Sequence, residues 1–290
     1  MRYGGRVGVG LVMMAVLAAA APASAQTLTG TLKKVKDTGT LTIGYRENAL
    51  PFSYTGSDGK PAGYSIDLCR EIALDVEREL KLSSLTVKWV GVAPDKRVDA
   101  VADGTVDIEC GTTTATLARQ EKVDFTLMTF VDGASLLIDE ASGIQSARDL
   151  ASKKIGVVAG TTTAKVLGDY LREQSIGATV VPVKDHDEGL AELQASRLDA
   201  YASDRVMLIG IALQARGTQR FALVPDPLSY EPYAFMVRRD DSAFRLVANR
   251  TLARLYRSGA VGAIYAKWFA ALGKPAPMLL IMYALQGLPE

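Results

Sequence analysis

Two threonine-rich turns carry the groups best suited to bind a small anion. Gly111-Thr112-Thr113-Thr114-Ala115 leads towards Arg119, and Gly160-Thr161-Thr162-Thr163-Ala164 repeats the pattern later in the chain. Glycine lets the backbone turn sharply at a strand end, and the threonines place hydroxyls and free N–H groups at a helix N-terminus, where a carboxylate is favoured. Turn and helix-cap chemistry alone would explain one such copy. Two copies in matched positions favour a ligand held between two similar lobes.

The elements around these turns predict an α/β fold. Strand-like segments lie at 41–45, 86–90, 106–110, 154–158, 179–183, 198–202 and 234–237, and helix-like segments at 65–80, 95–103, 163–173, 188–195, 242–256 and 260–272. Such alternation is typical of mostly parallel sheets flanked by helices, whose ligands lie at the C-terminal ends of the strands. Arg46 and Gly111 fall at such ends.

The order of these elements predicts two lobes joined by a two-stranded hinge. We expect residues 26–132 and 231–290 in the first lobe and 133–230 in the second, because the helix, strand and polar tip of 97–110 recur at 189–203. The last two predicted helices would return the chain to the first lobe. An apolar run at 278–285 is too short to span a bilayer and is expected to pack on that lobe.

Residues 1–25 are typical of a cleaved secretory signal peptide. Arg2 and Arg6 precede an apolar core, and Ala23-Ser24-Ala25 fits a small-residue cleavage site. Removing this segment changes the formal net charge from +1 to −1, because it holds two positive charges and no negative ones. A balanced charge provides no general attraction for nucleic acid or an anionic membrane. We therefore predict an exported protein with no nucleic-acid partner and no membrane insertion.

The two cysteines, Cys69 and Cys110, are an even number in a chain expected to meet oxidising conditions. This favours a disulfide, with two buried free thiols as the alternative. Neither cysteine has metal ligands nearby in the sequence, and we predict no metal and no cofactor.

Several segments follow one another in an order known from one family. They are 46–54, 63–68, 109–114, 119–120, 160–162 and 184–186. No single motif is specific, but the ordered set resembles the periplasmic solute-binding proteins of polar amino-acid ABC transporters, most closely the glutamate/aspartate-binding branch. The resemblance implies a type II two-lobed periplasmic-binding-protein fold. It also implies a monomer in the periplasm that delivers an amino acid to a membrane permease.

The resemblance assigns the two ends of the amino-acid backbone to different groups. Arg119, helped by N–H groups near Thr114 and Thr161, is expected to bind the α-carboxylate, since a guanidinium can bond both oxygens at once. The Thr112 carbonyl, the Thr114 hydroxyl and Asp204 are expected to accept from the α-ammonium. The alternatives are a solvated helix-face charge for Arg119 and a helix N-cap for Asp204.

The resemblance also assigns the side chain of the ligand. Arg46, Arg97 and His186 are expected to face a second carboxylate, with Thr112 adding a hydroxyl. Burying so much positive charge is costly unless an anion neutralises it, which favours an acidic amino acid. For the single histidine, a satisfied structural role is the alternative.

Two departures leave the ligand open among glutamate, aspartate, glutamine and other polar amino acids. Pro94 stands where relatives usually have serine, and Val158 where they often have threonine. An enzyme on the same scaffold, such as a cyclohexadienyl dehydratase, would need a general acid or base from His186, Glu109 or Glu47. The sequence contains no Gly-x-Ser-x-Gly, His-Glu-x-x-His or phosphate-binding loop, so we predict no catalytic residue. A sensor ectodomain is disfavoured because no transmembrane segment follows the predicted lobes.

Overall fold

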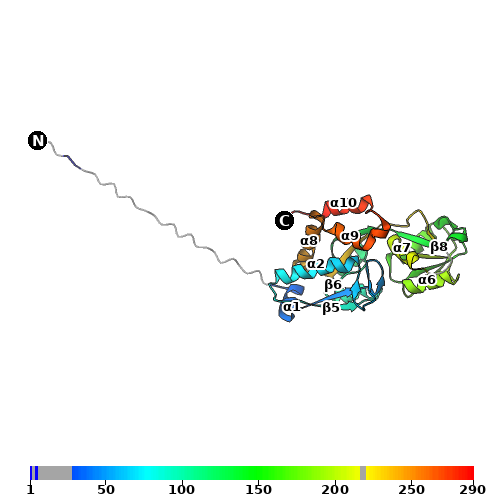
Figure 1. The fold of residues 1–290 in the computed structure, drawn as a ribbon, viewed down its shortest axis with the longest axis horizontal. Helices are drawn as coiled ribbons and strands as arrows, with labels where there is room; N and C mark the ends of the chain where they lie inside the picture. Colours follow the sequence, from blue (N-terminus) through cyan, green and yellow to red (C-terminus); the bar gives the residue numbers. More distant parts are fainter. Residues whose placement is uncertain (2–3, 6–27, 216–219) are drawn as a thin grey trace.

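Two five-stranded sheets form the centres of two lobes (Figure 1). This computed structural model describes residues 1, 4–5, 28–215 and 220–290. The predicted signal peptide, residues 1–25, lies outside the described residues apart from 1, 4 and 5. None of the described helices is long and apolar enough to span a membrane.

The first sheet belongs to lobe 1 and has one reversed strand. Its order is β5 (Thr86–Gly91), β1 (Thr40–Tyr45), β6 (Ile108–Glu109), β13 (Glu231–Arg238) and β7 (Val123–Asp132). Strand β1 is parallel to β5 and β6, whereas β13 is antiparallel to β6 and β7. Lobe 1 also contains a small sheet of β2 (Asn48–Ala49), β3 (Ser53–Thr55) and β4 (Pro61–Ala62). Its helices are α1 (Gly30–Thr38), α2 (Tyr64–Glu79), α3 (Arg97–Ala102), α4 (Leu117–Gln120), α8 (Ser242–Arg257), α9 (Val261–Phe269), η3 (Ala270–Leu272) and α10 (Pro277–Gln286).

The second sheet repeats this plan in lobe 2. Its order is β10 (Thr179–Val183), β9 (Lys154–Val158), β11 (Ala200–Asp204), β8 (Ala134–Asp139) and β12 (Phe221–Leu223). Strand β9 is parallel to both neighbours, and β8 is the reversed strand. The helical segments of this lobe are η1 (Glu140–Ser142), η2 (Ala147–Leu150), α5 (Thr162–Glu173), α6 (His186–Gln194) and α7 (Arg205–Gln214). The predicted pair of mostly parallel sheets flanked by helices is therefore confirmed.

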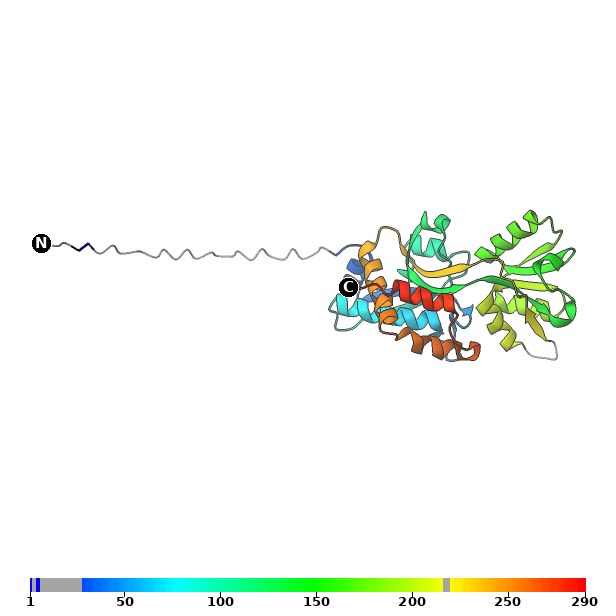
Figure 2. The ribbon, with the colours of Figure 1, turned by 90° about the horizontal axis from the view of Figure 1, so that it is seen from above.

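Two crossing segments lie side by side between the lobes (Figure 2). Strand β7 ends at Asp132 and β8 begins at Ala134, so a single glycine separates the two sheets. The chain returns into β13, whose first residue, Glu231, pairs with Asp132. A Cβ on Gly133 would lie 2.5 Å from the Ser229 carbonyl oxygen, so this close approach requires glycine. These segments form the expected two-stranded hinge.

An aromatic cluster supports the hinge from lobe 1. Phe52 lies edge-on to Phe130 of β7 and to Tyr233 of β13, with ring centroids 4.9 and 5.5 Å apart. Tyr64 of α2 and Phe269 of α9 complete the cluster, and all five rings are buried. Edge-to-face pairs contribute about 0.5–1.5 kcal/mol each beyond the burial of their area. The cluster therefore holds both crossing strands against the helices.

The predicted disulfide between Cys69 and Cys110 is present. It joins α2 to the residue just before Gly111, across a sequence separation of 41 residues. A loop of this length corresponds to roughly 4 kcal/mol of stabilisation in the chain-entropy description. The bond thus anchors the start of the first threonine-rich turn.

Helix α10 contains the apolar run at 278–285 and covers the open edge of β7. Its side chains Leu279, Met282 and Tyr283 are buried in the core of lobe 1. The Gln286 amide accepts from the Met128 N–H at 2.7 Å and donates to the Met128 carbonyl at 3.4 Å. A side chain that pairs with an edge strand removes a template for unwanted strand addition.

Replacing Gln286 with alanine should lower the free energy of unfolding by about 1 kcal/mol, because the Met128 N–H loses its acceptor, while the Met128 carbonyl keeps its bond from the Tyr256 hydroxyl. Leu285→Ala is the control, since that neighbouring side chain is 73% exposed and should change stability by less than about 0.5 kcal/mol. Urea unfolding measures both variants. Equal losses in the two would show that the amide contributes no specific stabilisation.

Candidate functional site

The predicted site residues converge where the strand ends of lobe 1 face the helix starts of lobe 2. In lobe 1, Arg46 follows β1, Arg97 begins α3, and the first threonine-rich turn follows β6. In lobe 2, Thr161 precedes α5, His186 begins α6, and Asp204 ends β11. The lobes touch here, because the Thr114 and Thr162 hydroxyl oxygens are 3.1 Å apart. This is the edge of each sheet at which ligands of α/β proteins bind.

Three arginines make the lobe 1 side strongly positive. Arg46 is 3% exposed and Arg97 is 2% exposed, while Arg119 is half-buried. Arg97 donates to the Thr112 carbonyl at 3.5 Å, and Arg119 donates to the Thr114 carbonyl at 2.8 Å. Within residues 28–215 and 220–290, none of the three forms an ion pair, and the Arg97 Nε has no hydrogen-bond partner. Among the described residues, the positive charge of these three arginines therefore has no direct anionic partner.

The charge of Arg97 acts on both Arg46 and Arg119. Burial, followed by repulsion from Arg97, lowers the pKa of Arg46 to about 10. The same two causes lower the pKa of Arg119 to about 10. Because both pKa values stay well above neutral pH, the site keeps its positive charge. A bound anion would relieve this repulsion.

Glu109 is the buried carboxylate whose negative charge opposes this repulsion. Its Oε2 accepts from the Thr113 hydroxyl at 2.7 Å, and its Oε1 has no hydrogen-bond partner among the described residues. A Cβ on Gly111 would overlap Oε1 and would lie 2.9 Å from Arg46 Cγ. The turn therefore needs glycine so that the backbone can pass between these two side chains.

Two more buried carboxylates, Asp204 and Glu231, lie on the hinge side, and their negative charge acts on Arg119. Asp204 accepts from the Thr163 hydroxyl at 2.9 Å and from the Tyr233 hydroxyl. Burial, followed by the negative charge of Glu231, raises the pKa of Asp204 to about 6. Although Asp204 precedes α7, its side chain makes no capping bond to that helix. The N-cap alternative for Asp204 is therefore not realised.

Glu231 orients the hydroxyl of Thr114. The Thr114 Oγ1 donates to Glu231 Oε2 at 2.6 Å, and the other carboxylate oxygen accepts from Ser229 at 2.6 Å. With its proton directed at Glu231, the Thr114 hydroxyl presents lone pairs to any further donor. This arrangement suits an ammonium group.

The second threonine-rich turn leads directly into a helix. Thr161 caps α5 by accepting from the Ala164 N–H at 3.1 Å, and its own hydroxyl donates to the Val158 carbonyl at 2.7 Å. What it can offer a ligand is therefore the first-turn N–H groups of α5. The expectation of a helix N-terminus is right for this turn.

The same expectation is wrong for the first threonine-rich turn. There Thr114 pairs with Tyr233, and the Thr113 carbonyl accepts from the Ala234 N–H at 3.0 Å. Helix α4 begins only at Leu117. The physical reason is that the adjacent strand β13 provides backbone partners, so the turn continues as an extended segment before the helix.

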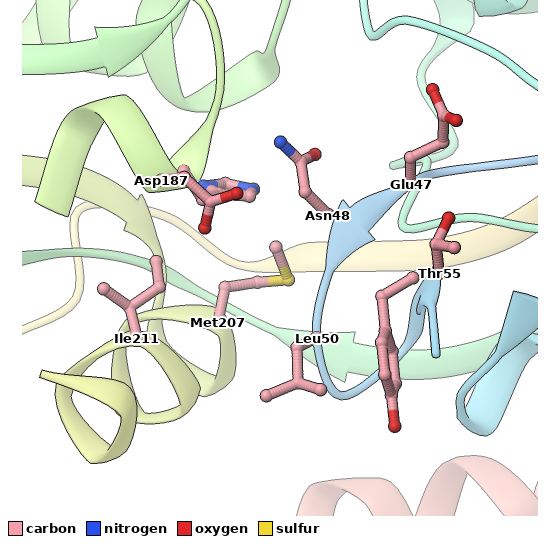
Figure 3. Close-up of a pocket in the computed structure, with 9 residues that line it drawn as sticks. Glu47, Asn48, Leu50, Thr55, Asp187, Met207 and Ile211 are labelled. Atoms are coloured by element: carbon pink, nitrogen blue, oxygen red, sulfur yellow. The ribbon is translucent and has the colours of Figure 1, made fainter. Parts of the chain in front are cut away.

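His186 lies at the other end of the site. Its Nδ1 is 2.7 Å from the Tyr201 hydroxyl, and burial, followed by the charge of Arg46, lowers the pKa of His186 to about 3. The imidazole is therefore neutral at physiological pH. It lines a cavity of about 160 Å³ between the lobes, where Met207 and Asn48 face the same space (Figure 3).

Arg46 lines a neighbouring cavity of about 500 Å³. The two cavities share lining residues from both lobes, including Glu47, Asn48 and Asp187. Pro94 also lines the larger cavity, at the position where a serine was expected. The arginine and the histidine therefore mark the outer end of the site.

Four residues of the site were not predicted from the sequence. They are Glu231, Thr163, Tyr201 and, as a charge partner rather than a possible catalyst, Glu109. Thr163 could have been predicted from the sequence, because it is the third threonine of the second turn. Glu231 and Tyr201 carried no local signal, since their partners Thr114 and His186 are remote or lie in another element.

Two known amino-acid-binding proteins are similar to this chain over most of its length. The L-glutamate/L-aspartate-binding protein of Pseudomonas aeruginosa is 39% identical over 267 residues, which cover 91% of this chain and 88% of that protein. The glutamate/aspartate import solute-binding protein of Escherichia coli is 32% identical over 250 residues, covering 86% and 82%. These relatives are described as binding proteins.

A solved structure shares the fold. An ancestral amino acid-binding protein, described as a precursor of cyclohexadienyl dehydratase, superposes with a TM-score of 0.72 at 26% identity, covering 83% of this chain and 100% of the other. The predicted two-lobed type II periplasmic-binding-protein fold is thus confirmed. Residues 41–271 match one family along most of the chain. This chain belongs to the bacterial extracellular solute-binding proteins, family 3.

Proposed function

We propose that this protein is the periplasmic substrate-binding component of an amino-acid ABC importer and binds glutamate or aspartate between its lobes. The observation that carries the proposal is the pair of buried arginines, Arg46 and Arg97, which form no ion pair within the described residues. A ligand with a second carboxylate would give them a direct anionic partner, whereas a neutral side chain would leave them with the attraction of nearby carboxylates such as Glu109, which forms no ion pair with either.

The backbone end of the ligand is assigned to the hinge side. Arg119 and the first-turn N–H groups after Thr161 would bind the α-carboxylate, since both are donors and carry positive charge or partial charge. Asp204 and the Thr114 hydroxyl would accept from the α-ammonium. The Thr112 carbonyl, already bonded to Arg97, has a second lone pair for the same ammonium.

The side-chain end is assigned to Arg46, Arg97 and His186. The arginines supply the charge that selects a carboxylate, and the neutral imidazole supplies one further polar contact. The Thr112 hydroxyl would add another donor.

Further parts of the proposal concern the whole molecule. We place the lobe boundaries at 26–132 with 231–290 and at 133–230, supported by the crossing of β7 into β8 and the pairing of Glu231 with Asp132. We also propose that the protein is exported by a cleaved signal peptide, acts as a monomer, and closes on its ligand at the hinge before docking to a permease. Membership of an extracellular solute-binding family supports export and transport.

An enzyme on this scaffold is the second candidate, because the ancestral structure is described as a precursor of a dehydratase. The site offers little acid–base chemistry. With the pKa of His186 lowered to about 3, the imidazolium form is not populated at neutral pH, so the neutral ring is a poor general acid and a weak base. We therefore propose binding without catalysis.

Equilibrium dialysis of the mature protein against labelled glutamate and aspartate tests this proposal. One bound amino acid per chain, released unchanged on unfolding, is the expected result. Incubation with a cyclohexadienyl acid should leave that compound intact. Enzyme-dependent loss of water from it would contradict the binding role.

The affinity for glutamate should fall as the pH falls through about 6. In the free protein, burial and the charge of Glu231 raise the pKa of Asp204 to about 6, but only the ionised carboxylate attracts an ammonium. Binding must therefore release the proton from Asp204, so Kd should rise about tenfold between pH 7 and pH 5. Calorimetric titration in buffers of different ionisation enthalpy measures both Kd and the released protons.

Asp204→Asn is the matched control. It should bind weakly, and the part of the pH dependence that Asp204 causes should be lost, whereas any part due to Asp132, whose pKa is raised to about 8 by burial, should remain. A wild-type Kd that stays constant from pH 7 to pH 5 would contradict the assignment of Asp204 to the ammonium.

A further inference from the structure

The hydroxyl of Tyr201 lies behind the predicted ligand-binding histidine. Tyr201 belongs to β11 and is fully buried, whereas His186 opens α6 and lines the cavity of about 160 Å³ between the lobes. The Tyr201 hydroxyl and the His186 Nδ1 are 2.7 Å apart. Tyr201 itself lines neither of the two interlobe cavities described above. Its polar atom is therefore positioned to act on a ligand through His186.

Two glycines make room for the Tyr201 ring. A Cβ on Gly189 of α6 would overlap the ring, and a Cβ on Gly156 of β9 would lie 3.2 Å from its Cδ2. Helix α6 and strand β9 can thus pack closely against the ring because these positions lack side chains. The ring is held in one place, and its hydroxyl has a fixed direction.

The hydrogen bond has only one workable donor. Neutral histidine has one nitrogen that donates and one that accepts. Burial raises the pKa of Tyr201, so the phenol keeps its proton. Among residues 28–215 and 220–290, His186 is the one hydrogen-bond partner of this hydroxyl. A buried O–H proton needs an acceptor, and the available acceptor is Nδ1.

We propose that Tyr201 is a positioning residue that fixes His186 in the tautomer with its proton on Nε2. This rests on the proposed function where it concerns the ligand: the Nε2–H then donates to the second carboxylate of glutamate or aspartate. In the other tautomer, Nε2 would present a lone pair to that carboxylate and repel it. Tyr201 thus decides whether the histidine attracts or rejects an acidic side chain.

The surroundings support this state. Among the described residues, Nε2 has no protein partner, and Arg46 from lobe 1 disfavours a second proton on the ring. Asp185 and Asp187 are the acidic groups next to His186 in the chain, and both act on the Tyr201 phenol by raising its pKa. They reinforce the role of the phenol as a proton donor that does not ionise.

The tautomer can be read directly, because His186 is the single histidine of the chain. Protein labelled with nitrogen-15 histidine should show, at neutral pH and without ligand, a proton on Nε2 and an unprotonated Nδ1. Tyr201→Phe keeps the ring but removes the hydroxyl, and its spectrum should show both tautomers in exchange. Tyr170→Phe, which removes a half-buried hydroxyl on α5, should leave the wild-type pattern unchanged.

Binding provides the second measurement. Tyr201→Phe should raise the Kd for glutamate or aspartate about tenfold, as expected when a hydrogen bond to a charged ligand is weakened. Tyr170→Phe should bind like the wild type. Circular dichroism and thermal unfolding verify that each variant is folded. If Tyr201→Phe does not fold, the wild-type spectrum alone still decides the tautomer.

Three results would overturn the inference. They are a wild-type histidine protonated on Nδ1, a folded Tyr201→Phe that keeps the pure Nε2–H form, and a mixed tautomer with unchanged affinity. A wild type that binds neither glutamate nor aspartate would refute the proposed ligand instead. Because the tautomer of His186 is measured without ligand, that result would still test the role of Tyr201 independently.

Discussion

Arg119→Ala should abolish measurable binding of every amino acid that the wild type binds. The α-carboxylate is common to all of them, and Arg119 is the cation assigned to it. Its guanidinium is already oriented by the Thr114 carbonyl, at 2.8 Å. Losing a charge-assisted contact in a closed cleft should cost about 2–5 kcal/mol in binding free energy. Calorimetric titration with glutamate, aspartate and glutamine measures the loss.

Lys122→Ala is the control for this experiment. It removes the same charge from a nearby exposed position, where Lys122 pairs with Asp99 at 3.0 Å. Surface pairs of this kind contribute little, so its affinities should match those of the wild type. If Arg119→Ala stays within a factor of two of the wild type, the α-carboxylate is bound elsewhere.

Arg46→Ala should reduce the preference for acidic ligands over neutral ones. Arg46 is assigned to the side-chain carboxylate, so its loss should weaken glutamate binding by about 2–5 kcal/mol and glutamine binding much less. Specificity is a difference of affinities, and the glutamate-to-glutamine ratio is therefore the quantity to measure. Arg119→Ala should lower both affinities alike.

Lys184→Ala is the matched control, because Lys184 lines the same cavity as Arg46 but its side chain is 86% exposed. If the overall positive charge of the cavity sets the glutamate-to-glutamine ratio, both variants should change this ratio. If direct contact between Arg46 and the ligand carboxylate sets it, only Arg46→Ala should change it. Thermal unfolding of Arg46→Ala is also needed, since a buried arginine stem contributes to packing. A folded Arg46→Ala with the wild-type ratio would refute the assignment.

The repeated local patterns were sufficient to predict most of the fold. Helix α5 lies within one residue of the predicted 163–173, since its buried residues Thr163, Leu167 and Leu171 recur at helical spacing, and strand β10 matches the predicted 179–183. The strand expected at 198–202 is instead β11, Ala200–Asp204. The shift arises because the Leu198 and Asp199 N–H groups bond to Glu192 and Lys154 as the end of a turn.

The two-stranded hinge and part of β13 were predicted, but β7 and β8 were not predicted as strands, for a physical reason. Strands β7 and β8 owe their extended form to pairing with β13, β11 and β12, all distant in sequence. Helix α7 was missed because it is apolar around much of its circumference and shows little periodicity. The spacing of apolar residues within a segment does not indicate which distant strands will pair with it.

The predicted site residues share one region, but their bonds depend on tertiary structure. The spacing of the predicted strands could suggest that the threonines and arginines lie at neighbouring strand ends. It could not show that Glu231 orients Thr114 from the hinge, or that Asp204 accepts from Thr163 and Tyr233. These details arise from the crossing of the chain, which brings residues 114, 204 and 231 together.

The most direct test of the central claim is a calorimetric titration of the mature protein with each of the twenty amino acids. Two buried arginines without an ion-pair partner in the described chain should select a second carboxylate. We expect glutamate or aspartate to bind one-to-one and more tightly than glutamine, asparagine or any basic amino acid. Tight binding of lysine or arginine, with none of glutamate or aspartate, would contradict the account.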